Sequence, residues 1–174
     1  MPGHDNHLGD YYLIKSDSLG TLNWAKTYGN NSPNEAYSVR QTSDGGYILN
    51  GYCQISNSNR LIKLNSIGDT LWNKGYMGCQ TGTYAEQTKD GGYIVLVNTG
   101  DYKSAGYNPA LLKLNAIGDT VWCKLYGGLG LTPHGGTDWG NFVKQTSDNG
   151  FVMVGYTYSL VGAGSSDMYL VKTD

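Results

Sequence analysis

The stretch Gln41-Thr42-Ser43-Asp44-Gly45-Gly46-Tyr47 decides the fold, because it returns twice along the chain. Its counterparts are Gln87-Thr88-Lys89-Asp90-Gly91-Gly92-Tyr93 and Gln145-Thr146-Ser147-Asp148-Asn149-Gly150-Phe151. An Asp-Gly or Asn-Gly pair marks a tight β-hairpin, since these residues tolerate a positive φ. We therefore predict hairpins that join residues 38–42 to 47–52, 84–88 to 93–97, and 142–146 to 151–156.

A second repeated block is anchored on Lys15, Lys63 and Lys113, each preceded by two aliphatic residues. A glycine, a tryptophan, a lysine and a tyrosine follow at fixed distances from each anchor. These columns are Gly20, Gly68 and Gly118; Trp24, Trp72 and Trp122; Lys26, Lys74 and Lys124; Tyr28, Tyr76 and Tyr126. A fourth anchor, Lys172, lies in residues 167–174, which nearly duplicate residues 10–17. A repeat of about 50 residues indicates a repeat architecture and not an ordinary single domain.

Each repeat is expected to hold four short antiparallel strands, and no segment shows the period of a helix. The sequence thus predicts an all-β chain of β-propeller blades, with three repeats per chain; a β-solenoid is the rival architecture. The tryptophan and tyrosine columns should pack between blades. The second lysine column should guard the outer strand edge. The anchor lysines should be buried against an acidic or carbonyl partner, extend outward to solvent, or line a funnel for an anion.

The expected organisation is an N-terminal extension over 1–9, repeats over about 10–57, 58–107 and 108–166, and a closing strand over 167–174. This amounts to groups of two, four, four and three strands. Because propellers have about 4–8 blades, we predict that two chains join head to tail into a six-bladed homodimeric ring. A junction blade would take its first two strands from one chain and its fourth from the other, while two copies of the third strand compete for one place. A three-bladed monomer and a fragment of a longer array are the alternatives.

The repeat also resembles a known type, carried here by Ser38-Val39-Arg40-Gln41-Thr42-Ser43-Asp44-Gly45-Gly46-Tyr47-Ile48 and by residues 10–29. It is similar to the propeller-like repeats of large secreted bacterial surface proteins, with a strand order like that of WD40 blades. The resemblance covers residues 10–174, and the second repeat departs from it most, at Ser58-Asn59-Arg60. It implies an extracellular or cell-surface location and carries no chemistry. Residues 1–10 are polar, so no signal peptide is expected in this chain.

Composition excludes several classes of function. The net charge is −2 over 174 residues, which argues against a nucleic-acid binder. No apolar run approaches the ~20 residues of a membrane-spanning helix, so no membrane insertion is expected. Motifs for hydrolases, phosphate loops and calcium loops are absent from the sequence. We therefore predict a non-enzymatic binding or assembly scaffold without cofactor or metal.

The place where the repeat is broken points to a ligand site, because loops on a rigid scaffold carry specificity. The loop over 127–140 is longer than its counterparts and holds His134, Asp138 and Trp139; a second irregular loop holds Tyr102 and Tyr107. An aromatic platform with polar groups suits a sugar, so the alternative function is a lectin-like propeller with a glycan or protein ligand. Trp139 could instead plug the end of the core.

The three cysteines, Cys53, Cys79 and Cys123, occupy different columns of the repeat. An odd number leaves at least one thiol free or paired between chains, and we expect isolated, buried thiols.

Overall fold

The computed structural model describes residues 9–29, 33–101, 106–127, 137–159 and 166–174. Within these ranges the regular structure is all β, and paired strands run antiparallel, as predicted. None of the described segments forms a helix long and apolar enough to cross a membrane. The strands are β1 (Tyr11–Ser16), β2 (Leu22–Tyr28), β3 (Asn34–Gln41), β4 (Tyr47–Cys53), β5 (Ser58–Leu64), β6 (Thr70–Tyr76), β7 (Thr81–Gln87), β8 (Tyr93–Asp101), β9 (Gly106–Leu114), β10 (Thr120–Leu125), β11 (Asp138–Gln145), β12 (Phe151–Thr157) and β13 (Asp167–Thr173).

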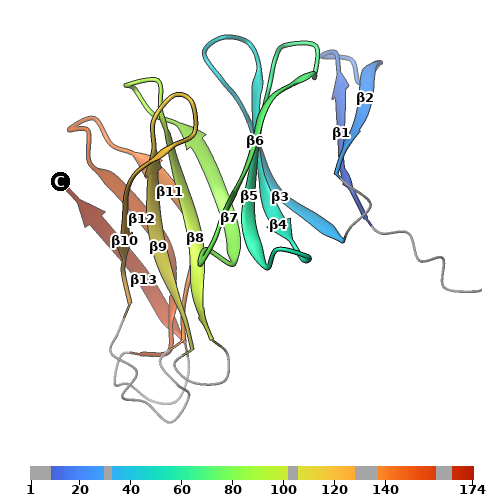
Figure 1. Ribbon diagram of the computed structural model, residues 1–174. Helices are drawn as coiled ribbons and strands as arrows, with labels where there is room; N and C mark the ends of the chain where they lie inside the picture. The colour runs from blue at the N-terminus through green and yellow to red at the C-terminus, as the bar shows by residue number, and fades with distance from the viewer. Residues whose placement is uncertain (1–8, 30–32, 102–105, 128–136, 160–165) are drawn as a thin grey trace, which may run out of the picture.

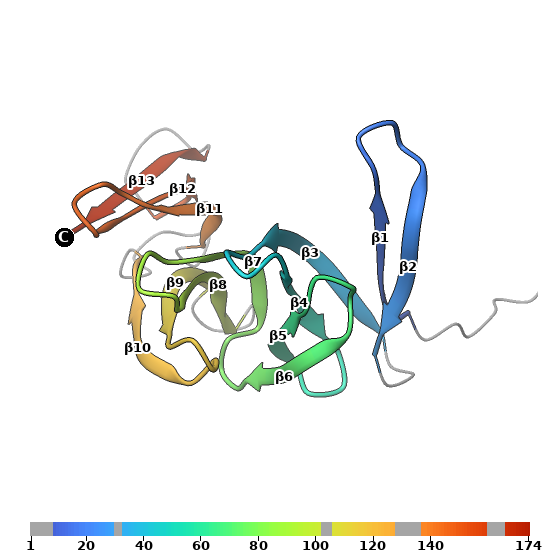
Figure 2. The same ribbon diagram turned by 90° about the horizontal axis from the view of Figure 1, so that it is seen from above.

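The strands form four sheets in which each strand lies beside its neighbour in sequence (Figure 1). Sheet 1 holds β1–β2, sheet 2 holds β3–β4–β5–β6, sheet 3 holds β7–β8–β9–β10 and sheet 4 holds β11–β12–β13. Strand β7 contacts both β3 and β11, and sheets 2, 3 and 4 fan out from these first strands (Figure 2). The fold is therefore propeller-like, with the grouping of two, four, four and three strands that the sequence predicts.

The repeated Thr-x-Asp-Gly-Gly segment forms the predicted hairpin connection. The amide of Gly45 donates to the carbonyl oxygen of Thr42, and the amide of Thr42 donates to that of Gly46, both at 2.9 Å. Gly45 has a φ of +76°, and Asn149 takes the same place in sheet 4 with a φ of +69°. Asp44 does not share the positive φ. Its side chain closes the turn instead, because Oδ1 accepts hydrogen bonds from the Thr42 hydroxyl (2.6 Å) and the Gly46 amide (3.0 Å).

The hydrophobic core lies between the sheets and not within a single layer. Three clusters of buried side chains fill the spaces between sheets 1 and 2, sheets 2 and 3, and sheets 3 and 4. Leu61 on β5 faces sheet 3 while its neighbour Ile62 faces sheet 1, as the alternation of side chains along a strand requires. Each central sheet thus buries both faces, and its stability depends on a neighbour on each side.

Candidate assembly interface

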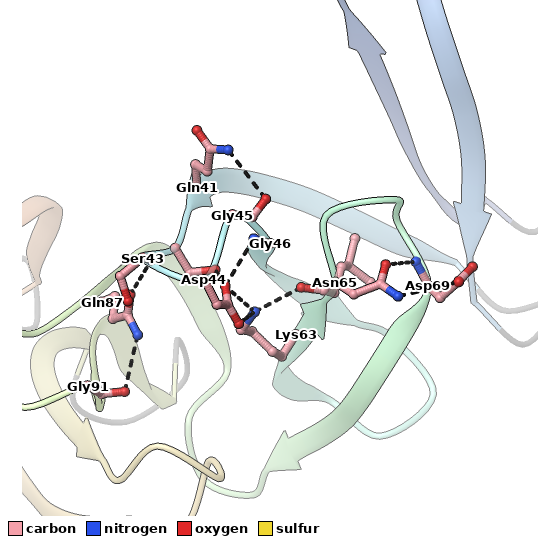
Figure 3. A network of polar contacts seen from close by, with 12 residues as sticks. Gln41, Ser43, Asp44, Gly45, Gly46, Lys63, Asn65, Asp69, Gln87 and Gly91 are labelled. Carbon is pink, nitrogen blue, oxygen red and sulfur yellow. Dashed lines mark hydrogen bonds and ion pairs between the residues drawn. The ribbon is translucent and has the colours of Figure 1, made fainter.

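Each complete sheet holds a buried lysine against an aspartate of its own first hairpin. Lys63 Nζ lies 2.8 Å from Asp44 Oδ2 and donates a hydrogen bond to the carbonyl oxygen of Leu64 (2.9 Å), as Figure 3 shows for the aspartate. Lys113 pairs with Asp90 in the same way in sheet 3 (2.9 Å). Both lysines are less than a tenth exposed. The prediction of a buried lysine with acidic and carbonyl partners is confirmed here, and the anion funnel is wrong for these two residues.

The aspartates of these pairs are held in the ionised form. The hydrogen bond from Lys63 is the largest cause that lowers the pKa of Asp44 to about 2. For Asp90 the hydrogen bond from the Thr88 hydroxyl contributes most, and Lys113 adds to it, which gives a pKa of about 2. The ion pair therefore ties the first hairpin of a sheet to its third strand at neutral pH.

A glutamine column links each hairpin turn to the next sheet. Gln87 Oε1 accepts a hydrogen bond from the amide of Ser43 in sheet 2, at 2.8 Å, and Gln145 Oε1 accepts one from the amide of Lys89 in sheet 3, at 2.8 Å. The other end of the Gln87 amide donates to the carbonyl oxygen of Gly91 in its own turn (3.3 Å); Figure 3 shows both contacts. The turns are therefore joined in one direction, from each sheet back to the one before it.

The outer strands are joined to the following sheet by tyrosine and tryptophan. The hydroxyl of Tyr28 donates to the carbonyl oxygen of Gly68 (2.7 Å), and that of Tyr76 donates to Gly118 (2.7 Å). The tryptophan column makes edge-to-face pairs with an aromatic residue of the next sheet, with ring centroids 5.7–5.9 Å apart. These pairs are Trp24–Tyr47, Trp72–Tyr93 and Trp122–Phe151. The predicted packing of these columns between blades is confirmed.

The second lysine column also contacts the next sheet. Lys26 Nζ lies 2.6 Å from Asp69 Oδ1, and Lys74 Nζ lies 2.5 Å from Asp119 Oδ1. All four side chains are at least a third exposed, so each pair contributes little to stability. Lys26 and Lys74 thus also bind the neighbouring sheet, a contact that the prediction of an edge guard did not include.

At the N-terminal end of the array, one column of this interface is uncovered. Val39 on β3 has the same place in its sheet as Ala85 on β7 and Val143 on β11. Ala85 and Val143 are fully buried against the preceding sheet, whereas Val39 is 39% exposed. A hollow of about 160 Å³ lies beside Val39, with Trp24 and Tyr47 also in its wall. Sheet 1 supplies only a third and a fourth strand here, so the place of its first two strands is empty among the described residues.

The third strands show the same contrast at both ends. Ile14 on β1 is 56% exposed, although its counterparts Ile62 and Leu112 are at most 2% exposed in the contact with the preceding sheet. Leu170 on β13 is 60% exposed, although its counterpart Leu61 is fully buried against the following sheet. We call these surfaces the N-terminal and C-terminal end faces. Both expose side chains whose counterparts in the complete sheets are buried against a neighbouring sheet.

The structure places part of the predicted ligand site together. Tyr107 on β9 and Trp139 on β11 form an edge-to-face pair with centroids 5.4 Å apart. Trp139 lies directly opposite Tyr156, which in turn contacts Tyr158 (5.8 Å). Tyr156 and Tyr158 were missed from the sequence, although their x-Tyr-x-Tyr spacing puts both on one face of a strand. These four aromatic residues form a partly exposed row at one end of sheets 3 and 4.

Of the polar residues predicted for this site, the structure describes Asp138. Asp138 is buried, and its carboxylate accepts a hydrogen bond from the hydroxyl of Thr157. That contact joins β11 to β12, and a ligand contact of Asp138 stays a prediction. His134 and Tyr102 lie outside the described residues.

All three cysteines are thiols. Cys53 and Cys79 are buried, as predicted, whereas Cys123 is exposed. Burial is the largest cause that raises the pKa of Cys79 to about 11, and the neighbouring thiol of Cys123 adds to the shift. The sequence columns did not indicate that Cys79 and Cys123 would meet, because the contact joins the connection between β6 and β7 to the outer strand β10.

Comparison with known proteins supports the fold alone. No family model matches the chain. No curated protein matches it either. A protein of unknown function from Bacteroides caccae has a similar structure, with a TM-score of 0.53 and 11% identity over 91% of this chain. A GH43 β-1,3-galactosidase is more distant, with a TM-score of 0.48 and 12% identity over 90% of this chain and 34% of its own. The chain spans about half (53%) of the length of the Bacteroides caccae structure.

Proposed function

We propose that the chain is a non-enzymatic propeller scaffold that assembles head to tail with a second copy of itself. In the resulting ring, two complete sheets from each copy and two shared junction sheets make six blades. A junction sheet takes β11 and β12 from one copy and β2 from the other. The ring closes after two copies, so the head-to-tail contact does not lead to a filament.

The exposure of Val39 and the hollow beside it carry this proposal. The two missing strands of sheet 1 are a first and a second strand, and β11 and β12 at the other end of the chain are a first and a second strand. Where the complete sheets 2 and 3 meet, the first strand of sheet 3, β7, packs against the first two strands of sheet 2, β3 and β4. When β11 and β12 of a second copy take the empty place, they cover Val39 as sheets 2 and 3 cover Ala85 and Val143.

The polar contacts of the array continue across the same junction. Gln41 is exposed, and its Nε2 donates to its own turn at Gly45 (3.3 Å), as Gln87 does at Gly91. Its Oε1 is therefore placed like the Oε1 of Gln87, which accepts a hydrogen bond from the amide of the preceding turn. In the ring that preceding turn belongs to the second copy, and Ser147 holds the place of Ser43. The second copy thus provides both an apolar and a hydrogen-bonding match.

The proposal is tested by the mass of the assembly in solution, by light scattering at several concentrations. We expect twice the mass of one chain. Val39→Glu should weaken the dimer at least about tenfold, because it puts a charge in the covered contact. Ile55→Glu is the matched control, since Ile55 is an exposed residue of the β4–β5 turn and is not in the wall of the hollow beside Val39 or the hollow beside Trp122, and it should leave the mass unchanged. A monomer at all concentrations would overturn the proposal and would favour further blades supplied by a longer chain.

A second candidate function rests on the contact between Tyr107 and Trp139. Partly exposed aromatic rings from two sheets can stack on the apolar face of a sugar ring, which is the lectin-like alternative. A glycan array tests it, with Trp139→Ala as the variant and Tyr37→Ala as a control, since Tyr37 is an exposed aromatic residue on β3. Binding that is lost in the Trp139 variant alone supports a carbohydrate site. Binding that both variants retain, or no binding, removes it.

A further inference from the structure

The junction sheet of the proposed ring has two candidates for its third strand, β1 and β13. Their sequences are near duplicates, over residues 10–17 and 167–174. β13 pairs with β12 in the isolated chain, with Val152 opposite Lys172 and Val154 opposite Leu170. β1 pairs with β2, which is the only source of a fourth strand at the junction within the described residues. Only one of the two can lie between β12 and β2.

The ion pair that fixes β13 is more exposed than its counterparts. Lys172 Nζ lies 2.8 Å from Asp148 Oδ2, but the Lys172 side chain is 39% exposed, against 5% for Lys63 and 9% for Lys113. Lys15 on β1 makes the same main-chain contact as these lysines, to the carbonyl oxygen of Ser16 (3.2 Å). Sheet 1 has no first hairpin to supply an aspartate to Lys15 among the described residues. Asp148 therefore has two lysines that fit its position, one in each copy.

The loop between β1 and β2 has the geometry of the loops that receive the outer strand of a preceding sheet. The amide of Gly20 donates to the carbonyl oxygen of Asp17 (3.1 Å), as Gly68 does to Asn65 (3.1 Å). Gly20 and Gly68 share a φ of +83°. The Trp24 ring lies 3.0 Å from the Cβ position of Gly68, whereas no described atom lies within 4 Å of that position at Gly20.

A matching space is open at the other end of the chain. Trp122 lies on β10, and Tyr126 directly follows this strand. They correspond to Trp72 and Tyr76, which contact the loop at Gly118. Sheet 4 has no fourth strand and hence no such loop among the described residues. A hollow of about 540 Å³ is found there instead, with Trp122, Phe151 and Asp174 in its wall. It lies where the loop between a third and a fourth strand would cover Trp122.

We infer that β1 of the second copy displaces β13 from β12 when the ring forms, so that β13 is a placeholder strand. This inference rests on the proposed function. By the register of β13, Lys15 then lies opposite Val152 and binds Asp148, and Ile14 lies opposite Met153. The hydroxyl of Tyr126 then donates to the carbonyl oxygen of Gly20 of the second copy, and the Trp122 ring packs over the same Gly20. In the isolated chain β13 keeps the edge of β12 paired, which protects it from other strands.

Two reciprocal variants test which strand is used. If β1 is the third strand, Ile14→Glu should weaken the dimer at least about tenfold, because Ile14 becomes buried against sheet 3 of the other copy. Leu170→Glu should leave the dimer as tight or tighter, because β13 is released. The opposite result, with loss of the dimer only in the Leu170 variant, would show that β13 keeps its place and would overturn the inference.

A charge reversal tests the pairing itself. Lys15→Asp alone should weaken the dimer, and the double variant Lys15→Asp, Asp148→Lys should restore it, because the reversed pair forms between copies. Within one copy the same double variant places two positive charges together, because position 148 then repels Lys172. Because Asp148→Lys by itself also releases β13, it is measured alone as the control, and restoration beyond its own effect requires that positions 15 and 148 meet in the dimer. A double variant weaker than either single one would contradict the inference.

Hydrogen exchange gives a readout that needs no variant. On dimerisation of the unmodified chain, the amides of residues 167–174 should lose protection and those of residues 11–16 should gain it. Retained protection of β13 in a dimer would overturn the strand exchange and leave the proposed function intact. A chain that stays monomeric would overturn both, so the two failures are distinguishable.

Discussion

The hydroxyl of Tyr76 donates a buried hydrogen bond to the carbonyl oxygen of Gly118 in the next sheet, at 2.7 Å. Gly118 has a φ of +81°, and the Trp72 ring lies 3.0 Å from its Cβ position. Glycine is therefore required here for both the backbone conformation and the space. The repetition of this relationship at Tyr28 and Gly68 shows that the tyrosine and glycine columns of the sequence are two halves of one contact.

The first prediction concerns this hydrogen bond. Tyr76→Phe removes the donor and leaves a buried carbonyl oxygen without a partner, so it should lower the free energy of unfolding by about 1–3 kcal/mol. Urea denaturation measures this value. Tyr12→Phe is the control, because the Tyr12 side chain is 61% exposed, and it should change the free energy by less than about 0.5 kcal/mol. Both variants are measured in the Val39→Glu background, so that assembly does not cover β1.

The second prediction separates the space at Gly118 from its backbone conformation. Gly20→Ala should lower the free energy of unfolding only by the strain of the left-handed conformation, about 1–2 kcal/mol, because its Cβ position is open. Gly118→Ala should cost more, since the added methyl group also meets the Trp72 ring. Both are measured by urea denaturation in the Val39→Glu background, so that assembly does not cover Gly20. Equal costs at the two glycines would contradict the role of the Trp72 contact.

The third prediction is a loss of stability in acid. The pKa of Asp44 and of Asp90 is about 2 in the folded chain, against 3.8 for an unperturbed aspartate. A carboxyl group whose pKa is lowered by folding stabilises the folded state above its unfolded pKa, and this contribution is lost as the pH falls through the folded pKa. The free energy of unfolding should therefore decrease from about pH 5 to pH 2. Asp44→Asn should be less stable than the unmodified chain at pH 7, with a smaller difference at pH 2.

The fourth prediction concerns the hairpin turn. Gly45 has a positive φ, and an added Cβ would meet only Ser66, at an ordinary 3.8 Å. Gly45→Asn should be tolerated, since Asn149 has this conformation in sheet 4 and asparagine adopts it readily. Gly45→Val should cost at least about 1–2 kcal/mol, because a β-branched side chain is strained there. Similar melting temperatures for the two variants would be evidence against strain at Gly45.

The fifth prediction concerns the thiols. Cys123 is exposed, whereas Cys53 and Cys79 are buried and the pKa of Cys79 is raised to about 11. Because the thiolate is the reactive form, N-ethylmaleimide at neutral pH should modify Cys123 first. Intact mass should show one adduct on the folded chain and three in urea. Rapid addition of two adducts without urea would contradict the burial of Cys53 and Cys79.

The strand pattern and the turns were predictable because they depend on neighbours in sequence. The Gln-Thr-x-Asp-Gly-Gly segment carries its own turn chemistry, and the side chain of Asp44 closes the turn that follows Thr42. The ligand residues were less predictable. In the sequence, nothing distinguishes Asp138 from an exposed polar residue, but the pairing of β11 with β12 places its carboxylate against Thr157. Tyr107 meets Trp139 only because β8 and β9 contact β11.

The sequence by itself determined that the chain is built from repeated antiparallel sheets, since turn residues and strand periodicity are local properties of the backbone. It also determined which columns recur. Only the tertiary structure decided what those columns do, because the contacts of Lys26, Tyr28 and Gln87 lie in neighbouring sheets, at least 40 residues away. It likewise decided that Val39 and Ile14 are exposed while their counterparts are buried. Burial depends on whether a sheet lies alongside, and the same residue type is therefore core in the middle of the array and exposed at its ends.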